Sequence, residues 1–175
     1  MTENETNMGP VDHITVDAIG KPGKRVFYLQ GWQENKVVTL LVEKVQIQTL
    51  ALGIEEFLKE VHRRFEDLPG TSGDYDESKM HIQPPVDPLF RVSEFGLAYD
   101  SDQDKVVLVA REMPANELVE EETRIIKFWC TRPQLHALST WSLEVSNRGR
   151  QRCPQCGEPM DPEGHFCPKK NGHKS

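Results

Sequence analysis

The order of hydrophobic patterns along the chain is the feature that most constrains its fold. Three short runs rich in β-branched and aromatic residues come first, at Ile14–Ile19, Arg25–Gly31 and Lys36–Val42, with turn-forming residues between them. From Lys44 to about Phe65 the apolar residues instead recur every three or four positions, which is the spacing of one helix face. The sequence therefore predicts three strands followed by one helix.

The same order returns in the second half of the chain. Strands are expected at Phe90–Tyr99, Lys105–Arg111 and Arg124–Trp129. A helix should begin after Thr131, because its hydroxyl can cap the first amides and Gln134 completes a capping-box pattern. The chain is thus predicted to be an α+β protein of two βββα units, which form a mainly antiparallel sheet layer with two helices.

Composition divides the chain into three parts. Residues 1–10 are polar and are expected to be a disordered tail. Residues 11–147 form the α+β body, in which residues 66–88 are expected to be a mobile linker, because their Pro, Gly, Ser and acidic residues can bury little apolar surface. Residues 148–175 contain three of the four cysteines and are expected to be a zinc ribbon.

The cysteine spacing in the last part predicts a metal site. Cys153 and Cys156 lie in a CPQCG knuckle, where Gly157 can take the positive φ that lets backbone amides point at the sulfurs. A redox dithiol with the same spacing would need a helix to lower the thiol pKa, and Pro159 and Pro162 exclude a helix here. Thiolates combined with imidazole favour Zn²⁺, so we expect one structural zinc ion.

A closed zinc site needs four ligands, and the tail offers three cysteines. Cys167 is the third, and a histidine must supply the fourth. His165 lies two residues before Cys167, so on an extended segment both side chains point to the same side. His173 is the alternative, and spacing alone favours His165 only slightly.

Charge and hydropathy limit the partners that we expect. The whole chain has a net charge of −7. The segment from Arg148 to Ser175 has six basic and three acidic residues and therefore a charge of +3, which leaves −10 for the rest of the chain. An acidic body argues against a large non-specific nucleic-acid surface. No apolar run approaches the roughly 20 residues of a membrane span, and the N-terminus lacks the basic start and apolar core of a signal peptide. We therefore expect a cytoplasmic protein without a membrane partner.

Outside the tail, no residue pattern indicates catalysis. The histidines of the body are scattered and belong to no nucleophile motif, phosphate loop or metal spacing: His13, His62, His81 and His136. Gly20–Gly23 (GKPG) is interpreted as a hairpin turn, since it lacks the pattern of a phosphate loop. Cys130, at the end of an apolar strand, is expected to pack in the core.

Several stretches of the sequence resemble a known family. They are Gly20–Gln30 (GKPGKRVFYLQ), Val42–Gln46 (VEKVQ), Phe90–Asp100 (FRVSEFGLAYD) and Cys153–His173. The chain is similar over nearly its whole length to domain-of-unknown-function family 3090, which occurs in actinobacteria and related bacteria. The resemblance implies that the CPxCG and DPxGHxCP motifs are kept and that the position of His173 is often a tyrosine, which favours His165 as the fourth ligand. The family is uncharacterised, so the resemblance implies no activity or partner.

These observations favour a non-enzymatic binding or adaptor protein, whose zinc ribbon docks on the body or on an unidentified protein partner. One alternative is an enzyme of unfamiliar type, with a site between the two repeats where the GKPG and Phe95–Asp100 (FGLAYD) segments meet. Another is a protein that binds single-stranded nucleic acid through aromatic residues of the sheet and the basic tail, which the acidic body does not favour.

Overall fold

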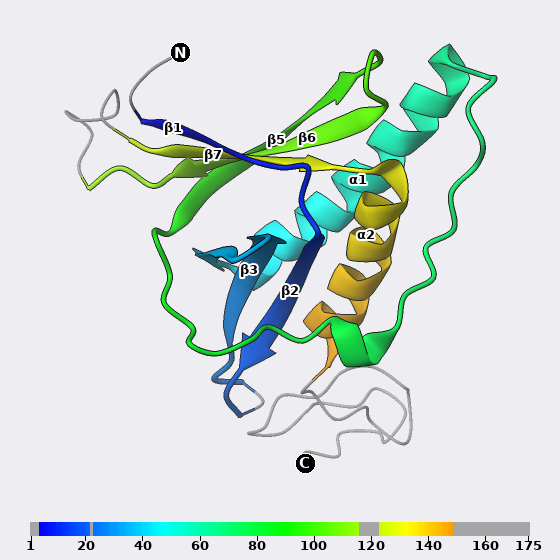
Figure 1. Cartoon of the computed structure of the whole chain (residues 1–175). Coiled ribbons are helices and arrows are strands. Elements are labelled where there is room, and N and C mark those ends of the chain that lie inside the picture. Colours follow the sequence, from blue (N-terminus) through cyan, green and yellow to red (C-terminus); the bar gives the residue numbers. More distant parts are fainter. Residues whose placement is uncertain (1–3, 22, 116–122, 149–175) are drawn as a thin grey trace, which may run out of the picture.

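Strands and helices follow the predicted order in the computed structural model, which describes residues 4–21, 23–115 and 123–148 (Figure 1). The first unit comprises β2 (His13–Ile19), β3 (Val26–Gln33), β4 (Lys36–Val42) and α1 (Lys44–Arg64). The second comprises β5 (Val92–Asp100), β6 (Lys105–Glu112), β7 (Ile125–Cys130) and α2 (Arg132–Asn147). The α+β class with two βββα units is therefore confirmed. A strand β1 (Glu5–Met8) and a short 3₁₀ helix η1 (Glu77–Lys79) complete the described elements.

The strands form two sheets, in place of the single layer that the sequence suggests. One sheet has the order β2-β3-β4, and the other has the order β1-β7-β6-β5. The two sheets come together where residues 89–91 lie beside β4: Leu89 N donates to Thr39 O (2.8 Å) and Leu41 N donates to Phe90 O (2.9 Å). The register then shifts between Val92 and Glu94. A bulge of this kind bends a strand, which explains why β5 leaves β4 and joins the second sheet.

Strand β1 corrects the expectation of a disordered tail over residues 1–10. Glu5–Met8 pair in parallel with Ile125–Phe128 of β7, and the Met8 side chain is fully buried. Lys127 Nζ also lies 2.9 Å from Glu5 Oε1. The strand has a single buried apolar residue and a partner at the far end of the chain, so no local hydrophobic pattern marks it.

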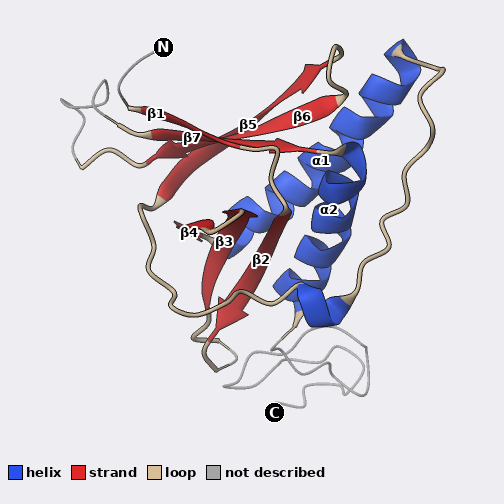
Figure 2. Cartoon of the chain, viewed as in Figure 1, coloured by secondary structure: helices blue, strands red, loops and turns tan. Residues whose placement is uncertain are grey.

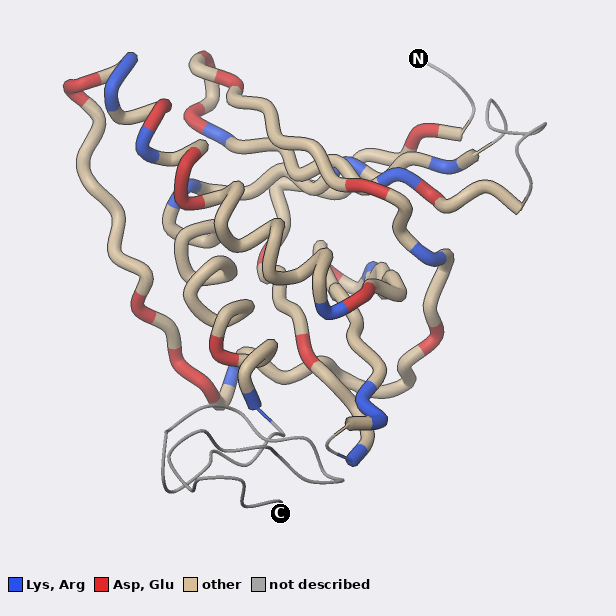
Figure 3. Tube along the Cα trace, turned by 180° about the vertical axis from the view of Figure 1, so that it is seen from behind, with Lys and Arg blue, Asp and Glu red and all other residues tan. Residues whose placement is uncertain are grey.

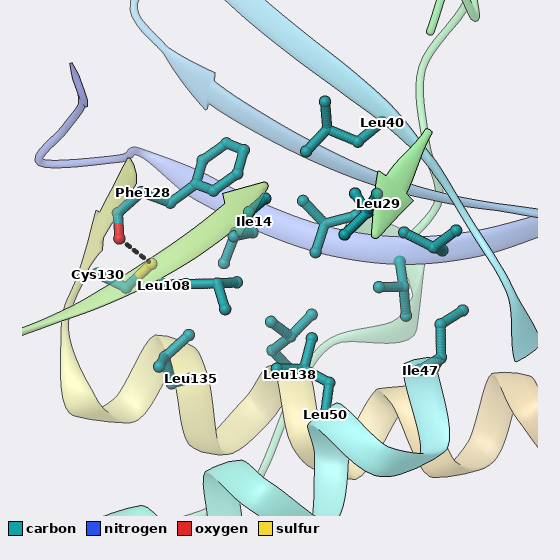
Figure 4. Close-up of a cluster of buried hydrophobic side chains, with 14 of the residues drawn as sticks. Ile14, Leu29, Leu40, Ile47, Leu50, Leu108, Phe128, Cys130, Leu135 and Leu138 are labelled. Carbon is teal, nitrogen blue, oxygen red and sulfur yellow. Dashed lines mark hydrogen bonds between the residues drawn. The ribbon is translucent and has the colours of Figure 1, made fainter. Parts of the chain in front are cut away.

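Both helices pack on the strands and enclose one core (Figure 2). In Figure 4, Leu50 and Ile47 of α1 and Leu135 and Leu138 of α2 point towards strand residues from both sheets. Cys130 belongs to this core, as predicted: its side chain is fully buried, and burial raises the pKa of its thiol well above the ordinary value. A buried, protonated thiol is inert, which agrees with a packing role.

The start of α2 matches the sequence prediction closely. Gln134 N donates to Thr131 Oγ1 at 3.1 Å, and Thr131 N donates to Gln134 Oε1 at 2.8 Å. This reciprocal pair is the capping box. Among the described residues, no helix is both long and apolar enough to cross a membrane.

Residues 66–91, which we call the strap, differ from the expected linker. The strap leaves the end of α1, runs past α2, crosses β2 and β3 and returns to β5 (Figure 1). Met80 is 3% exposed, and its carbonyl accepts a 2.6 Å bond from Thr15 Oγ1. Gln83 N donates to Gln30 Oε1 at 2.8 Å. The polar composition does not predict these contacts. The strap is held mainly by hydrogen bonds and a few buried side chains rather than by a periodic apolar face.

Candidate functional site

A cleft between α1, α2 and the start of the strap brings five titratable side chains together: Glu55, Lys59, His62, Arg132 and His136. Its volume is about 370 Å³, which falls in the range of small-ligand pockets. We call it the inter-helix cleft. The residues that line it come from both repeats and from the strap: Glu55, Leu58, Lys59, His62, Gly70, Thr71, Arg132 and His136.

Helix periodicity explains why these side chains converge. Glu55, Lys59 and His62 are spaced four and three residues apart on α1, so they lie on one face of that helix. Arg132 and His136 are four residues apart at the start of α2 and share a face in the same way. Because the two helices pack against each other, the two faces form opposite walls of one cavity.

Arg132 is fixed in place at the base of the cleft. Its Nε donates to Asp104 Oδ1 at 2.8 Å, and its Nη1 donates to Pro69 O at 2.8 Å. The hydrogen bond from Arg132 holds the pKa of Asp104 below its ordinary value, although burial opposes this shift. Tyr99 also donates its hydroxyl to Asp104 Oδ1 at 2.7 Å, and burial together with this bond raises the pKa of Tyr99 to about 12. The guanidinium charge is thus neutralised and held rigidly.

His136 is held from the strap side. Its Nδ1 lies 2.7 Å from Thr71 Oγ1. Two residues further on, the backbone of Gly73 passes so close to α2 that a Cβ there would lie 3.1 Å from His136 Cδ2 and would collide with Thr140 Oγ1. A glycine at position 73 therefore lets the strap lie directly against the imidazole.

Side chains, and not the α2 terminus, are the groups that this cleft offers to a ligand. Two amides of the first turn of α2 are used internally, since Gln134 N and Leu135 N donate to Thr131, and residue 133 is a proline without an amide hydrogen. Among the residues that the structure describes, Lys59 makes a single long contact of 3.7 Å with Glu56, between side chains that are 74% and 80% exposed. Such exposed pairs are weak, so the ammonium of Lys59 can bind an anionic group beside His62.

The residues predicted to bind zinc lie outside the described ranges. These are Cys153, Cys156, His165 and Cys167, together with the alternative ligand His173. Within residues 4–21, 23–115 and 123–148, no group of three or more His, Cys, Asp or Glu side chains has the arrangement of a metal site.

The cleft is not the one that the sequence suggests for an enzyme. Gly20–Gly23 lies at the tip of the β2–β3 hairpin, with φ of +116° at Gly20 and +84° at Gly23, as expected for a turn. Phe95–Asp100 belongs to β5. None of the pockets described here is lined by both segments. No sequence pattern predicts the cleft, because His62 and His136 lie on different helices. Only the packing of those helices brings the two histidines to one cavity.

Of the three tryptophans, Trp141 is buried, and Trp32 and Trp129 are half-buried. Trp141 is fully buried, and its Nε1 donates to Val16 O at 2.6 Å. Trp129 Nε1 donates to Asn7 Oδ1 at 3.0 Å, and the Trp32 ring lies 5.2 Å from that of His13. The buried Trp141 cannot serve as a stacking platform for bases.

Fold and site together define a two-repeat α+β protein with a cleft between its helices that is mainly apolar and carries several titratable side chains. The chain belongs to the family described as "Protein of unknown function (DUF3090)", whose model matches residues 7–167. The search of curated proteins and the search of solved structures found no significant match.

Proposed function

We propose that this protein binds a small organic ligand in the inter-helix cleft and acts as a binding protein rather than as an enzyme. The observation that carries the proposal is the cleft itself. It has the volume of a ligand site, and Glu55, Lys59, His62 and His136 line it from both repeats. Convergent polar groups around an apolar cavity are the usual features of a ligand pocket.

The lining indicates the chemistry of the ligand. Leu58 and the stems of the longer side chains offer apolar surface. Lys59 and His62 lie next to each other on α1 and can bind one acidic group, while Glu55, one turn earlier, accepts a hydrogen-bond donor. We therefore expect a compact molecule with an apolar part, a carboxylate or phosphate, and a hydroxyl or amino group.

Co-purification tests this proposal. The tagged full-length protein is isolated from its own cells under mild conditions, and its bound small molecules are identified by mass spectrometry. The test variant is Gly70→Trp, because Gly70 lines the cleft and an added Cβ there meets no atom within 4 Å. The matched control is Gly53→Trp, which also has open space but lies outside the cleft. We expect one compound with the wild type and the control and none with Gly70→Trp; equal recovery from all three would refute the proposal.

A specific contact favours catalysis as the second candidate. The Thr71 hydroxyl and His136 Nδ1 are 2.7 Å apart in the cleft, which is the distance between a nucleophile and its base. We rank binding first because Gln134 N and Leu135 N, two of the α2 amides that could stabilise an oxyanion, already donate to Thr131. If the co-purified compound is converted by wild type and not by His136→Gln, the protein is an enzyme.

The C-terminal tail adds a metal-binding function to the proposal. Cys153, Cys156, His165 and Cys167 would hold one Zn²⁺ as a closed structural site, and four protein ligands leave no position for a reactive water. The ribbon has few apolar residues, so metal binding would supply its folding energy.

Elemental analysis checks the zinc prediction. We expect about one zinc ion per chain, as the ligand count requires, and its loss in Cys153→Ser and in His165→Ala. His173→Ala is the matched control and should keep the metal. Loss of zinc in His173→Ala, with retention in His165→Ala, would assign the fourth ligand to His173.

The charge of the chain indicates which class of macromolecule could be its partner. We infer a protein partner in the cytoplasm and do not favour nucleic acid, because the chain carries a net charge of −7 and acidic and basic segments are interspersed in the view of Figure 3. A salt-sensitive mobility shift of labelled single-stranded DNA with the full-length protein would reverse this preference.

A further inference from the structure

The two walls of the inter-helix cleft differ in how their polar side chains are used. On the α1 wall, the side chains of Glu55 and His62 have no hydrogen bond or ion pair with a described residue, and Lys59 has one weak contact on its own helix. On the α2 wall, Arg132 and His136 are both bonded to the strap. The polar groups that remain free for a ligand therefore lie on one wall.

Three consecutive residues of the strap, Pro69–Thr71, occupy the α2 wall. Pro69 O accepts a bond of 2.8 Å from Arg132 Nη1, and Thr71 Oγ1 lies 2.7 Å from His136 Nδ1. The residue between them also lines the cleft. The strap thus presents a carbonyl and a hydroxyl to this wall, which are groups that a polar ligand of the cleft would itself present.

The first part of the strap, residues 66–74, has few other attachments. In the described part of the chain, the two bonds to the α2 wall are the only hydrogen bonds or ion pairs that join this segment to α2 or to a sheet. Aromatic rings fix both of its ends: Phe65 packs on Tyr99 with ring centroids 5.4 Å apart, and Tyr75 packs on Trp141 at 5.3 Å. The segment can therefore leave α2 between two fixed ends when two hydrogen bonds and one backbone packing contact are broken.

We propose that Pro69–Thr71 is an autoinhibitory contact, which occupies Arg132 and His136 until a ligand of the inter-helix cleft displaces it. The inference rests on the proposed function, because it concerns the ligand of the same cleft. Displacement leaves the anchor of the guanidinium intact, since Arg132 Nε and Nη2 hold Asp104 and only Nη1 holds the strap. Both α2 side chains then become available to the ligand.

The displaced groups narrow the class of ligand. An oxygen acceptor must replace Pro69 O at Arg132, and a hydroxyl must replace that of Thr71 at His136. A carboxylate forms a stronger hydrogen bond with a guanidinium than a neutral carbonyl does, so a carboxylate favours the exchange. We therefore expect a hydroxycarboxylate with an apolar body.

Proteolysis measures the release of the segment without a ligand. Endoproteinase Glu-C cleaves after acidic residues, and its rate within residues 66–74 follows the population in which the segment has left α2. Thr71→Val keeps the branched shape and removes the hydroxyl. This variant should raise the cleavage rate by about two- to tenfold, which is the effect of one hydrogen bond between neutral groups on an equilibrium.

Ser72→Ala is the matched control for proteolysis. The Ser72 hydroxyl accepts a bond from Asp74 N inside the same segment and does not reach α2, so this variant should be cleaved like wild type. Equal cleavage of wild type and Thr71→Val would overturn the proposal, because the bond to His136 would then not hold the segment in place.

A fluorescent hydroxycarboxylate, 3-hydroxy-2-naphthoate, tests the competition with a ligand. Titrated into the full-length protein, it should bind Thr71→Val about two- to tenfold more tightly than wild type, because less of the autoinhibitory contact must be broken. It should also accelerate Glu-C cleavage within residues 66–74 of wild type, since it displaces the segment. A ligand that left the strap in place would instead slow cleavage by stabilising the folded state.

The outcomes separate this inference from the proposed function. Equal or weaker binding of the probe to Thr71→Val, with binding lost in Gly70→Trp, would keep the cleft as a ligand site and overturn autoinhibition. Slower cleavage of wild type in the presence of bound probe would overturn it as well. Binding to neither wild type nor Thr71→Val would also overturn the inference, and the co-purification experiment would then decide the proposed function separately.

Discussion

At the scale of single residues, two glycines illustrate how differently the same residue type is used. Gly31 of β3 faces β7: an added Cβ would lie 2.7 Å from Phe128 Cε1 in the buried core. Gly53 of α1 faces open space. The first glycine is imposed by packing between the two sheets, and the second is not explained by packing at all.

The two alanine substitutions should therefore change stability in opposite directions. We expect Gly31→Ala to lower the free energy of unfolding by about 1–3 kcal/mol, because the buried phenyl ring must move. Gly53→Ala should raise it by up to about 1 kcal/mol, the helix propensity difference between the two residues. Urea denaturation followed by circular dichroism measures both, and a destabilised Gly53→Ala variant would show that the helix needs this glycine.

Burial of His13 makes the stability of the folded protein depend on pH, and the sign of this dependence follows from the direction of its pKa shift. Its Nε2 is buried and has no hydrogen-bond partner among the described residues, and burial lowers its pKa below the ordinary value of 6.5. As the pH falls below 6.5, the unfolded chain takes up a proton at this position before the folded protein does. The folded state consequently loses stability in that range.

The matched variant for this effect is His13→Phe, which keeps an aromatic ring beside Trp32. Between about pH 7.5 and 5.5, wild type should lose more stability than the variant does, each compared with itself at the higher pH. Equal losses in thermal unfolding scans would show that other groups cause the acid sensitivity.

At the scale of elements, one ion pair joins three parts of the fold. Asp104 belongs to the turn between β5 and β6, and Arg132 starts α2 and also binds the strap through Pro69 O. The Arg132 side chain is 7% exposed and that of Asp104 43%. Removing the charge of Asp104 would leave a largely buried guanidinium without its counter-ion.

Asp104→Asn isolates this charge, because asparagine tolerates the φ of +50° at position 104. We expect a loss of about 1–2 kcal/mol in the free energy of unfolding, less than for a fully buried pair because the carboxylate is partly solvated. Asp102→Asn in the same turn, at an exposed position, is the control and should have no measurable effect.

The elements differ in how well the sequence predicts them, for physical reasons. Helix α2 was predicted with its cap, because Thr131 and Gln134 form a purely local pair. Strand β1 has no signal in the local sequence, because its stability comes from pairing with β7, about 120 residues later in the sequence. The sequence of the strap predicts a linker, because its order depends on isolated contacts such as that of Met80 with Thr15. Local signals are readable from sequence, and long-range ones are not.

At the scale of the whole molecule, the two repeats share one core. The buried cluster contains residues of both units, such as Leu40 and Leu108, and also Met80 of the strap. Neither unit can bury its apolar face alone, so the body should unfold in a single step. The cleft follows from the same packing, which is why single-residue patterns did not reveal it.

Cooperativity can be tested with one truncation in each repeat. Leu40→Ala and Leu108→Ala should each lower the free energy of unfolding by about 2–5 kcal/mol. In both variants, tryptophan fluorescence and circular dichroism should give the same urea midpoint. Separate midpoints, with each mutation shifting one of them, would show that the repeats fold independently.

The pairing of β1 with β7 also affects how the protein is made. A chain emerging from the ribosome presents Glu5–Met8 long before the strand that receives them, Ile125–Cys130. Domains tend to fold as units during synthesis, so the completed sheet must wait until most of the chain has been translated. The composition of β1 suits that delay, because Glu5, Thr6 and Asn7 precede the single apolar Met8. The unpaired segment therefore exposes little apolar surface through which it could aggregate with neighbouring chains.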